Sequence, residues 1–497
     1  MTSSLQPRSA ARGGPQKWDS SIPPPLRPLV RAYALGYASV VVPRLFTLVL
    51  QQVTTTRKSR GGGPDNGALQ PPRESAVVSL QRILRTGLDP QRFPAFCATL
   101  VGGSTLLEVG GTHGSSCLLT RLRLHHCGLL LSQCVATFTA AWFSLKLLQS
   151  KASQGFTETV SAEKGNDSNI TPKTIKYAGR TLDLSLFAFC RALDVVIGEL
   201  WAQRRTRRVA NQQWTRVETD VSRLADPSIF AVSCALIMWS WFYYPSRLPG
   251  AYNKWINSAA SVDKRLIEAL QRCRTKELRY GEETGQAQLL QGMCREYKWP
   301  LQWGDPAIAV PFPCEVVHMG CGPSCEYHAL SRFCRSFQWS MFTYLPLNLL
   351  LVARKPSFRK LKQALLSAAR SSAFLGAFIT FFYYGVCLAR TRIGPHLMGK
   401  DAEARNRIDG GLCVGTGCFA CGWSILLENP GRRKDMALFV APRALATLLP
   451  RRYPLDKQWR ETLVFAASTA VVFTCVLEKP TRIRGVLGNV LNTVLRP

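Results

Sequence analysis

The sequence is poor in acidic residues and in histidine, and it lacks the short motifs of several enzyme classes. It has 31 Asp and Glu against 63 Lys and Arg, and only 6 histidines among 497 residues. No complete Gly-x-x-x-x-Gly-Lys-Ser/Thr loop and no His-Glu-x-x-His pair occurs. A Gly-x-Gly-x-x-Gly run that would follow a strand is also missing. These absences argue against the nucleotide-binding and zinc-peptidase chemistries that such motifs supply.

The N-terminal region lacks the apolar segment that a secretory signal requires. Residues 1–28 contain several basic and serine residues but no apolar run, so we expect a disordered basic tail. The 17 cysteines do not form a disulfide framework, because many stand singly inside apolar runs, where cysteine packs as a small hydrophobic residue. We therefore expect a reducing compartment on at least one side. These cysteines are Cys97, Cys134, Cys190, Cys234, Cys387, Cys413 and Cys475.

The net charge of +32 permits nucleic-acid binding, attraction to anionic lipid, or basic loops beside membrane spans. The basic residues crowd between apolar runs, as in 121–123, 203–208 and 432–434. This placement favours the juxtamembrane interpretation, so we expect membrane lipids as partners and no nucleic acid.

Apolar runs recur along the chain, and the mean hydropathy of −0.01 conceals them. A helix crosses a bilayer with about 20 residues at 1.5 Å per residue. The pattern predicts an all-α polytopic membrane bundle of eight to ten apolar segments, and an interfacial helix over 76–88. The candidate segments are 29–50, 93–107, 128–148, 182–201, 229–244, 337–352, 369–388, 410–427, 436–449 and 463–477.

Two of the polar stretches between these segments are long. Residues 150–180 form a predicted loop that carries glycosylation sequons at Asn166 and Asn169. Residues 251–312 form a predicted polar, helical connector outside the hydrocarbon. In segment 182–201, Arg191 and Asp194 stand three residues apart, a spacing that would allow them to pair on one helix face.

The two halves of the chain resemble each other. The segment 186–193 (LFAFCRAL) matches 438–445 (LFVAPRAL), and other matches follow in the same order. We predict a first membrane repeat over 29–250 and a second over 336–485, followed by a tail over 486–497. A duplicated bundle is common among membrane transporters, although scaffolds duplicate as well. The buried-charge candidates are Arg191, Asp194, Arg370 and Arg443.

A cysteine- and histidine-rich block over 313–335 separates the repeats. Cys314-x3-His318 and Cys325-x2-His328 offer two thiols and two imidazoles, the ligands that tetrahedral zinc prefers. These four residues are therefore a candidate structural metal site, weighed against packing or redox roles for the cysteines. These roles remain an alternative, because the spacing is not that of a standard zinc finger. Further along, Gly411, Gly415, Gly417 and Gly422 are expected to let helices approach closely.

The second half resembles the transmembrane protein 135 family in its fungal form, with a remote similarity to Tim-type translocase subunits. The resemblance rests on the cysteine- and histidine-rich block, on 369–378 (ARSSAFLGAF) and on the run from 424 to 445. It covers roughly 314–450 well and 26–250 more faintly. It implies a non-enzymatic, multi-pass peroxisomal or mitochondrial membrane protein that acts in lipid or metabolite handling or in organelle dynamics.

Several partners and one other function follow as expectations. The resemblance implies a sterol or fatty-acyl ligand and contacts with other membrane proteins. The alternative function is a membrane-embedded lipid-modifying enzyme, whose chemistry would need a histidine or paired acids at the membrane face. His125, His126 and His396 are the histidines near predicted spans.

Overall fold

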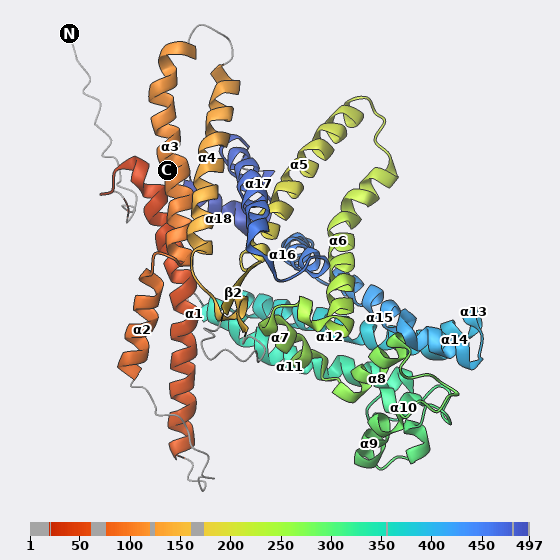
Figure 1. Ribbon diagram of the computed structural model, residues 1–497. Coiled ribbons are helices and arrows are strands. Elements are labelled where there is room, and N and C mark those ends of the chain that lie inside the picture. Colours follow the sequence, from red (N-terminus) through yellow and green to blue (C-terminus); the bar gives the residue numbers. More distant parts are fainter. Residues whose placement is uncertain are drawn as a thin grey trace, which may run out of the picture. The chain divides into compact units, whose positions relative to one another are not determined.

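The computed structural model describes most of the chain as α-helix (Figure 1). The chain is an all-α polytopic bundle, as the apolar pattern predicts. It divides into two compact units, one of residues 1–175, 458–483 and 487–497, the other of residues 176–457 and 484–486. The described residues are 19, 21–60, 76–119, 125–160, 173–353, 356–479 and 482–495, so the sequons at Asn166 and Asn169 and most of the predicted basic tail lie outside them.

The first unit is built from long antiparallel helices that pack through small residues. Gly36 of α1 lies against the backbone of Pro94, and Gly103 of α3 lies against Ala140 of α4, so the helix axes approach closely. Phe96 packs on Phe465 of α17 with ring centroids 5.8 Å apart. The helices are α1 (Arg27–Arg60), α2 (Ala76–Leu88), α3 (Phe93–Leu119), α4 (His125–Gln149), α17 (Gln458–Glu478) and α18 (Gly485–Leu495), whose first residues belong to the second unit.

The second unit contains the longest apolar helices and the larger hydrophobic core. α11 and α12 run side by side (Figure 1), and α12 packs on α15, which in turn contacts α6. Its long helices are α5 (Leu182–Ala210), α6 (Arg216–Tyr243), α11 (Cys325–Ala353), α12 (Phe358–Leu388), α15 (Cys413–Cys421) and α16 (Pro430–Leu448).

Two of these helical runs are interrupted by π-helical turns. η5 (Ala389–Ile393) follows α12 and leads into α13 (Gly394–Met398), while η6 (Ile408–Leu412) joins α14 (Ala402–Arg407) to α15. η7 (Gly422–Leu427) extends α15 as a 3-10 helix. π-turns within helices are frequent at functional sites.

The polar connector is helical, as expected from its sequence. Asp263 caps α8 by accepting a hydrogen bond from the Arg265 amide, and Lys276 ends the same helix in a left-handed conformation. The apolar sides of these short helices join the core of the second unit. The connector contains α7 (Gly250–Ala260), α8 (Lys264–Thr275), α9 (Ala287–Tyr297) and η4 (Leu301–Gly304), and α10 (Cys314–Val317) follows it in the cysteine- and histidine-rich block.

Short strands occupy parts of the predicted loop over 150–180. β2 (Lys173–Ala178) pairs antiparallel with β3 (Tyr453–Pro454), with Tyr177 opposite Pro454. β1 (Thr157–Val160) precedes them in the chain. The remaining short elements are the 3-10 turns η1 (Pro24–Leu26), η2 (Gln154–Phe156), η3 (Pro245–Arg247) and η8 (Leu455–Lys457).

Six helical runs in the described residues are long and apolar enough to cross a membrane, against the eight to ten segments expected. The expected segments 93–107, 182–201, 337–352 and 436–449 are helical but are not among the six. The chain is therefore a multi-pass membrane protein. The six runs are Pro24–Val49, Leu130–Gln149, Arg216–Tyr243, Phe358–Met398, Ala402–Leu427 and Leu455–Glu478.

The two matching segments of the predicted repeat lie in α5 and α16. These helices pack on one another, with Leu186 and Ala446 in a shared apolar cluster. The boundaries of the compact units, at 175 and 457, fall elsewhere than the predicted ends of the halves. The duplication itself stays a prediction.

Candidate metal centre

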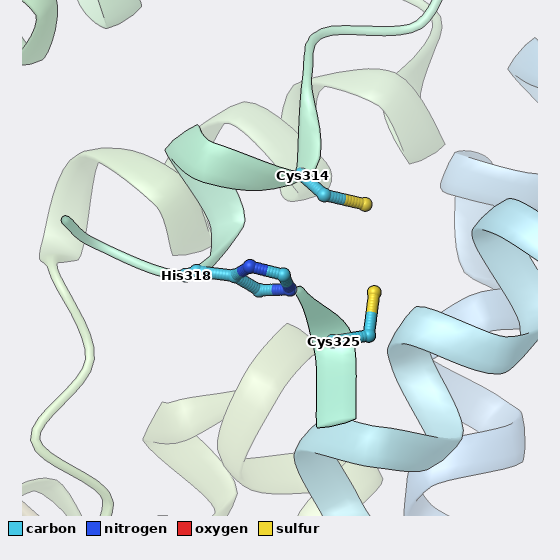
Figure 2. A group of neighbouring side chains, drawn as sticks. All are labelled: Cys314, His318 and Cys325. Atoms are coloured by element: carbon cyan, nitrogen blue, oxygen red, sulfur yellow. The ribbon is translucent and has the colours of Figure 1, made fainter. Parts of the chain in front are cut away.

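Three of the four predicted metal ligands converge at the junction between the connector and α11. Cys314 begins α10, His318 ends it, and Cys325 begins α11. Their ligand atoms, two thiol sulfurs and one imidazole nitrogen, all lie within 4.8 Å of one another. Figure 2 shows the three side chains directed toward a common point. This group could hold a metal ion, because thiolate and imidazole together suit zinc.

The loop between His318 and Cys325 turns the chain back on itself. Met319, Gly320 and Gly322 all adopt positive φ angles, 51°, 82° and 85°. Glycine tolerates this conformation without steric cost, which explains the two glycines here. The reversal returns Cys325 to the side of the α10 turn that carries His318.

His318 is fixed in orientation by its own loop. Its Nδ1 lies 2.7 Å from the carbonyl oxygen of Gly322. A carbonyl only accepts hydrogen bonds, so Nδ1 carries the proton and Nε2 is left with a free lone pair. Nε2 lies 3.4 Å from Sγ of Cys387, a residue near the end of α12. The side chain is 1% exposed, and burial lowers the pKa of His318.

His328, the fourth predicted ligand, lies beside the group and does not enter it. Its ring stacks on that of His318 with centroids 4.4 Å apart and planes inclined by 15°, and it meets the edge of Tyr383 at 5.3 Å. Both of its ring nitrogens are buried and accept or donate no hydrogen bond among the described residues. Burial lowers the pKa of His328 to about 3, so the ring is neutral at physiological pH.

The Cys314 thiol is protonated in the absence of an ion. Burial raises the pKa of the Cys314 thiol to about 11. The Cys325 thiol lies within 4.8 Å of the Cys314 thiol. The cysteines that the structure describes are all free thiols. Binding of a divalent ion would deprotonate these thiols, so its affinity would rise with pH.

The four buried-charge candidates differ in how deeply they are buried and in which residues they contact. Arg191 is 7% exposed and donates to the Arg484 carbonyl at 3.4 Å, while Asp194 pairs with the Arg484 guanidinium and not with Arg191. The expected Arg191–Asp194 pair is therefore replaced by a partner distant in sequence. Arg370 is exposed and Arg443 is half-buried over the Phe439 ring at 3.8 Å.

Among the described residues, the most deeply buried ion pair joins Arg390 and Asp409, which are not among the charges predicted to be buried. Arg390 of η5 and Asp409 of η6 have side chains that are each 2% exposed. The predicted spans end at 388 and begin again at 410, so both residues lie just outside them. Helical structure includes both charges, although the run that carries Asp409 is kinked at Gly411, and the two charges neutralise each other inside the protein.

The surroundings of this pair come from the connector. The Tyr280 hydroxyl donates to Asp409 at 2.5 Å, and Arg390 donates to the Phe312 carbonyl at 3.2 Å. The guanidinium carbon lies 4.4 Å from the centroid of the Phe312 ring. Nε and Nη2 of Arg390 and both carboxylate oxygens of Asp409 thus have hydrogen-bond partners, as buried charges require.

The expected close approach of helices at glycine is present at two positions. A Cβ added to Gly417 would lie 2.6 Å from the Phe382 carbonyl oxygen, and one added to Gly422 would lie 2.4 Å from Cα of Ala231. A Cβ added to Gly415 would instead lie at an ordinary contact distance, 3.6 Å from the Trp239 ring. Gly411 adopts φ 146°, which a side chain would strain.

Comparison of the chain with protein-family models, with curated proteins and with solved structures gives no match.

Proposed function

We propose that this chain is a non-enzymatic multi-pass protein of the peroxisomal or mitochondrial membrane that takes part in lipid or metabolite movement or in organelle dynamics. The six apolar helices support the membrane part of the proposal. The organelle and the cargo class rest on the resemblance of roughly 314–450 to the transmembrane protein 135 family.

The observation that carries a role in movement is the paired charge within two interrupted helices. η5 and η6 face one another through Arg390 and Asp409. Charges inside spans and broken helices recur where transporters hold or pass their cargo. The ligand class that fits an apolar surrounding with few polar groups is a sterol or a fatty-acyl chain, together with membrane lipid.

The membrane and organelle parts are tested by fractionation. A tagged chain should remain in the pellet after carbonate extraction and should co-sediment with peroxisomal or mitochondrial markers. A chain released by carbonate would overturn the membrane assignment. A carbonate-resistant chain found in the endoplasmic reticulum would overturn the organelle assignment and favour the lipid-modifying enzyme.

The functional part is tested by complementation. Cells that lack the protein should show altered sterol or fatty-acyl content in the organelle, and the wild-type chain should restore it. Arg191→Leu combined with Arg443→Leu should fail to restore it at equal protein level. Arg216→Leu combined with Arg223→Leu is the matched control, because both of these arginines are exposed on α6. Full restoration by the first variant would exclude a cargo route near α5 and α16.

The enzyme alternative has its own test. Replacement of His125 and His126 together by alanine should leave the lipid content unchanged if the protein is not an enzyme. Loss of function at a normal protein level would support the lipid-modifying activity instead.

A further inference from the structure

Cys387 lies against the three converged ligands, and it comes from a different element. It belongs to α12, separated by 69 residues from His318. Its thiol lies 3.4 Å from His318 Nε2. We infer that Cys387 is the fourth ligand of a tetrahedral zinc site made of three thiolates and one imidazole, with Cys314, His318 and Cys325 as the others.

The distances suit such a site. With zinc–sulfur bonds of about 2.3 Å and zinc–nitrogen bonds of about 2.0 Å, a tetrahedral angle separates sulfur from nitrogen by about 3.6 Å. His318 Nε2 and Cys387 Sγ are 3.4 Å apart. The ligand atoms of Cys314, His318 and Cys325 lie within 4.8 Å of one another, against about 3.8 Å for two sulfurs on one zinc ion. Cys387 is not part of that group of three, so closing the site requires its thiol to move toward them.

The imidazole is already oriented for coordination. Metal-bound histidines usually donate their other ring N–H to a carbonyl or a carboxylate, which fixes both tautomer and ring direction. The hydrogen bond from Nδ1 of His318 to the Gly322 carbonyl does this. Nε2 therefore presents its lone pair to the thiols of Cys387 and Cys325.

The stacking of the two histidines excludes His328 as the fourth ligand. The lone pair of an imidazole lies in the plane of its ring, and the two rings are nearly parallel, with centroids 4.4 Å apart. An ion in the plane of His318 at about 2 Å from Nε2 lies well outside the plane of His328. His328 instead covers the face of His318 and separates it from Tyr383.

Zinc binding balances as an acid–base reaction without any change of oxidation state. Three thiols lose three protons to solvent, and Zn²⁺ with three thiolates and a neutral imidazole carries one net negative charge. Arg390 follows Cys387 by one helical turn, and its positive charge acts on Cys314. The ion would fasten α10 and the first turn of α11 to the end of α12.

The direct test is the metal content and ligand set of the full-length protein purified in detergent. We expect one zinc ion per chain and an X-ray absorption spectrum with three sulfur neighbours and one nitrogen neighbour. This spectrum is measured on the wild-type chain, so it does not depend on the folding of any variant. Two sulfur and two nitrogen neighbours, or a chain that contains no zinc and takes up neither zinc nor cobalt, would overturn the inference.

Two pairs of variants identify the fourth ligand. Cys387→Ser should lose the zinc, whereas Cys413→Ser, a buried cysteine outside the group, should keep it. His328→Phe keeps the stacked ring and removes both nitrogens, and it should retain one zinc ion per chain. Zinc retained by Cys387→Ser and lost by His328→Phe would assign the site to His328. A mass consistent with a disulfide between Cys325 and Cys314 or Cys387 in the isolated native chain would instead support a redox pair and refute the metal site.

Discussion

Arg390 and Asp409 form a two-point ion pair inside the second unit. Nε of Arg390 donates to Oδ1 at 2.7 Å and a terminal guanidinium nitrogen donates to Oδ2 at 2.8 Å. The two residues stand on π-turns of successive helical runs, so this pair ties the helices together at the point where each departs from regular geometry. Such a two-point contact fixes direction as well as distance.

Removal of one partner of this pair should be more harmful than removal of both. Arg390→Leu leaves the Asp409 carboxylate buried without its cation and should lower the free energy of unfolding by about 3–5 kcal/mol. The double variant Arg390→Leu with Asp409→Leu removes both charges and should recover much of this loss. Thermal unfolding of the detergent-purified proteins, followed by size-exclusion fluorescence, measures both. Equal losses in the single and double variants would show that the pair does not couple the two helices.

The hydroxyl of Tyr280 should contribute to the free energy of unfolding through its hydrogen bond to Asp409. Tyr280→Phe keeps the ring, which is 1% exposed, and removes the hydrogen bond to Asp409. A hydrogen bond to a charged group contributes about 1.5–3 kcal/mol, so we expect a loss of that size in unfolding free energy. Tyr327→Phe is the control, since Tyr327 is 63% exposed and its change should leave the stability within about 0.5 kcal/mol. A Tyr280→Phe protein as stable as wild type would contradict the role given to this hydroxyl.

The contact between α12 and α15 should not tolerate a methyl group at Gly417. Gly417→Ala would place Cβ 2.6 Å from the Phe382 carbonyl oxygen and 2.9 Å from the Val386 side chain. Overpacking of this kind costs about 1–3 kcal/mol. Gly415→Ala, on the same helix, places Cβ 3.6 Å from the Trp239 ring, so it should cost little. Equal thermal stability of the two variants would show that the helices separate freely.

Protonation of the Asp263 carboxylate at acid pH should destabilise α8. The side-chain hydrogen bond from Arg265 holds the pKa of Asp263 below its usual 3.8. A carboxylate with a lowered folded-state pKa stabilises the fold above its unfolded pKa of about 3.9, and this stabilisation is lost as pH falls through the folded value. The protection of the amides of Lys264–Thr275 against hydrogen exchange, taken relative to the intrinsic rate at each pH, should therefore fall below about pH 4.

Substitutions at Asp263 separate its charge from its capping role. Asp263→Ala should accelerate this exchange at neutral pH by a factor equivalent to about 0.5–2 kcal/mol, the usual contribution of an N-cap. Asp263→Asn retains a capping oxygen and cannot ionise, so its exchange should lose the acid dependence. An unchanged acid dependence in Asp263→Asn would assign the effect to another group.

The sequence alone determined the class of this protein and the position of most of its helices. An apolar run of about 20 residues buries its backbone polar groups only as a helix in lipid, so composition is sufficient to identify it. Runs 29–50 and 463–477 were found in this way. The convergence of Cys314, His318 and Cys325 was also predictable, because the three lie close together in the chain and are separated by a glycine-rich turn.

Tertiary structure decided which distant groups meet. Cys387 and His328 are both plausible ligands by residue type, and only the packing of α12 beside α11 brings the Cys387 thiol to His318 and turns His328 into a stacked neighbour. Arg390 and Asp409 are costly in an apolar segment taken singly, and they become favourable only when the fold pairs them. Local patterns fix the helices because backbone hydrogen bonds and hydrophobicity act over a few residues. The partners of buried charges and thiols depend on which helices pack together, which no short stretch of sequence encodes.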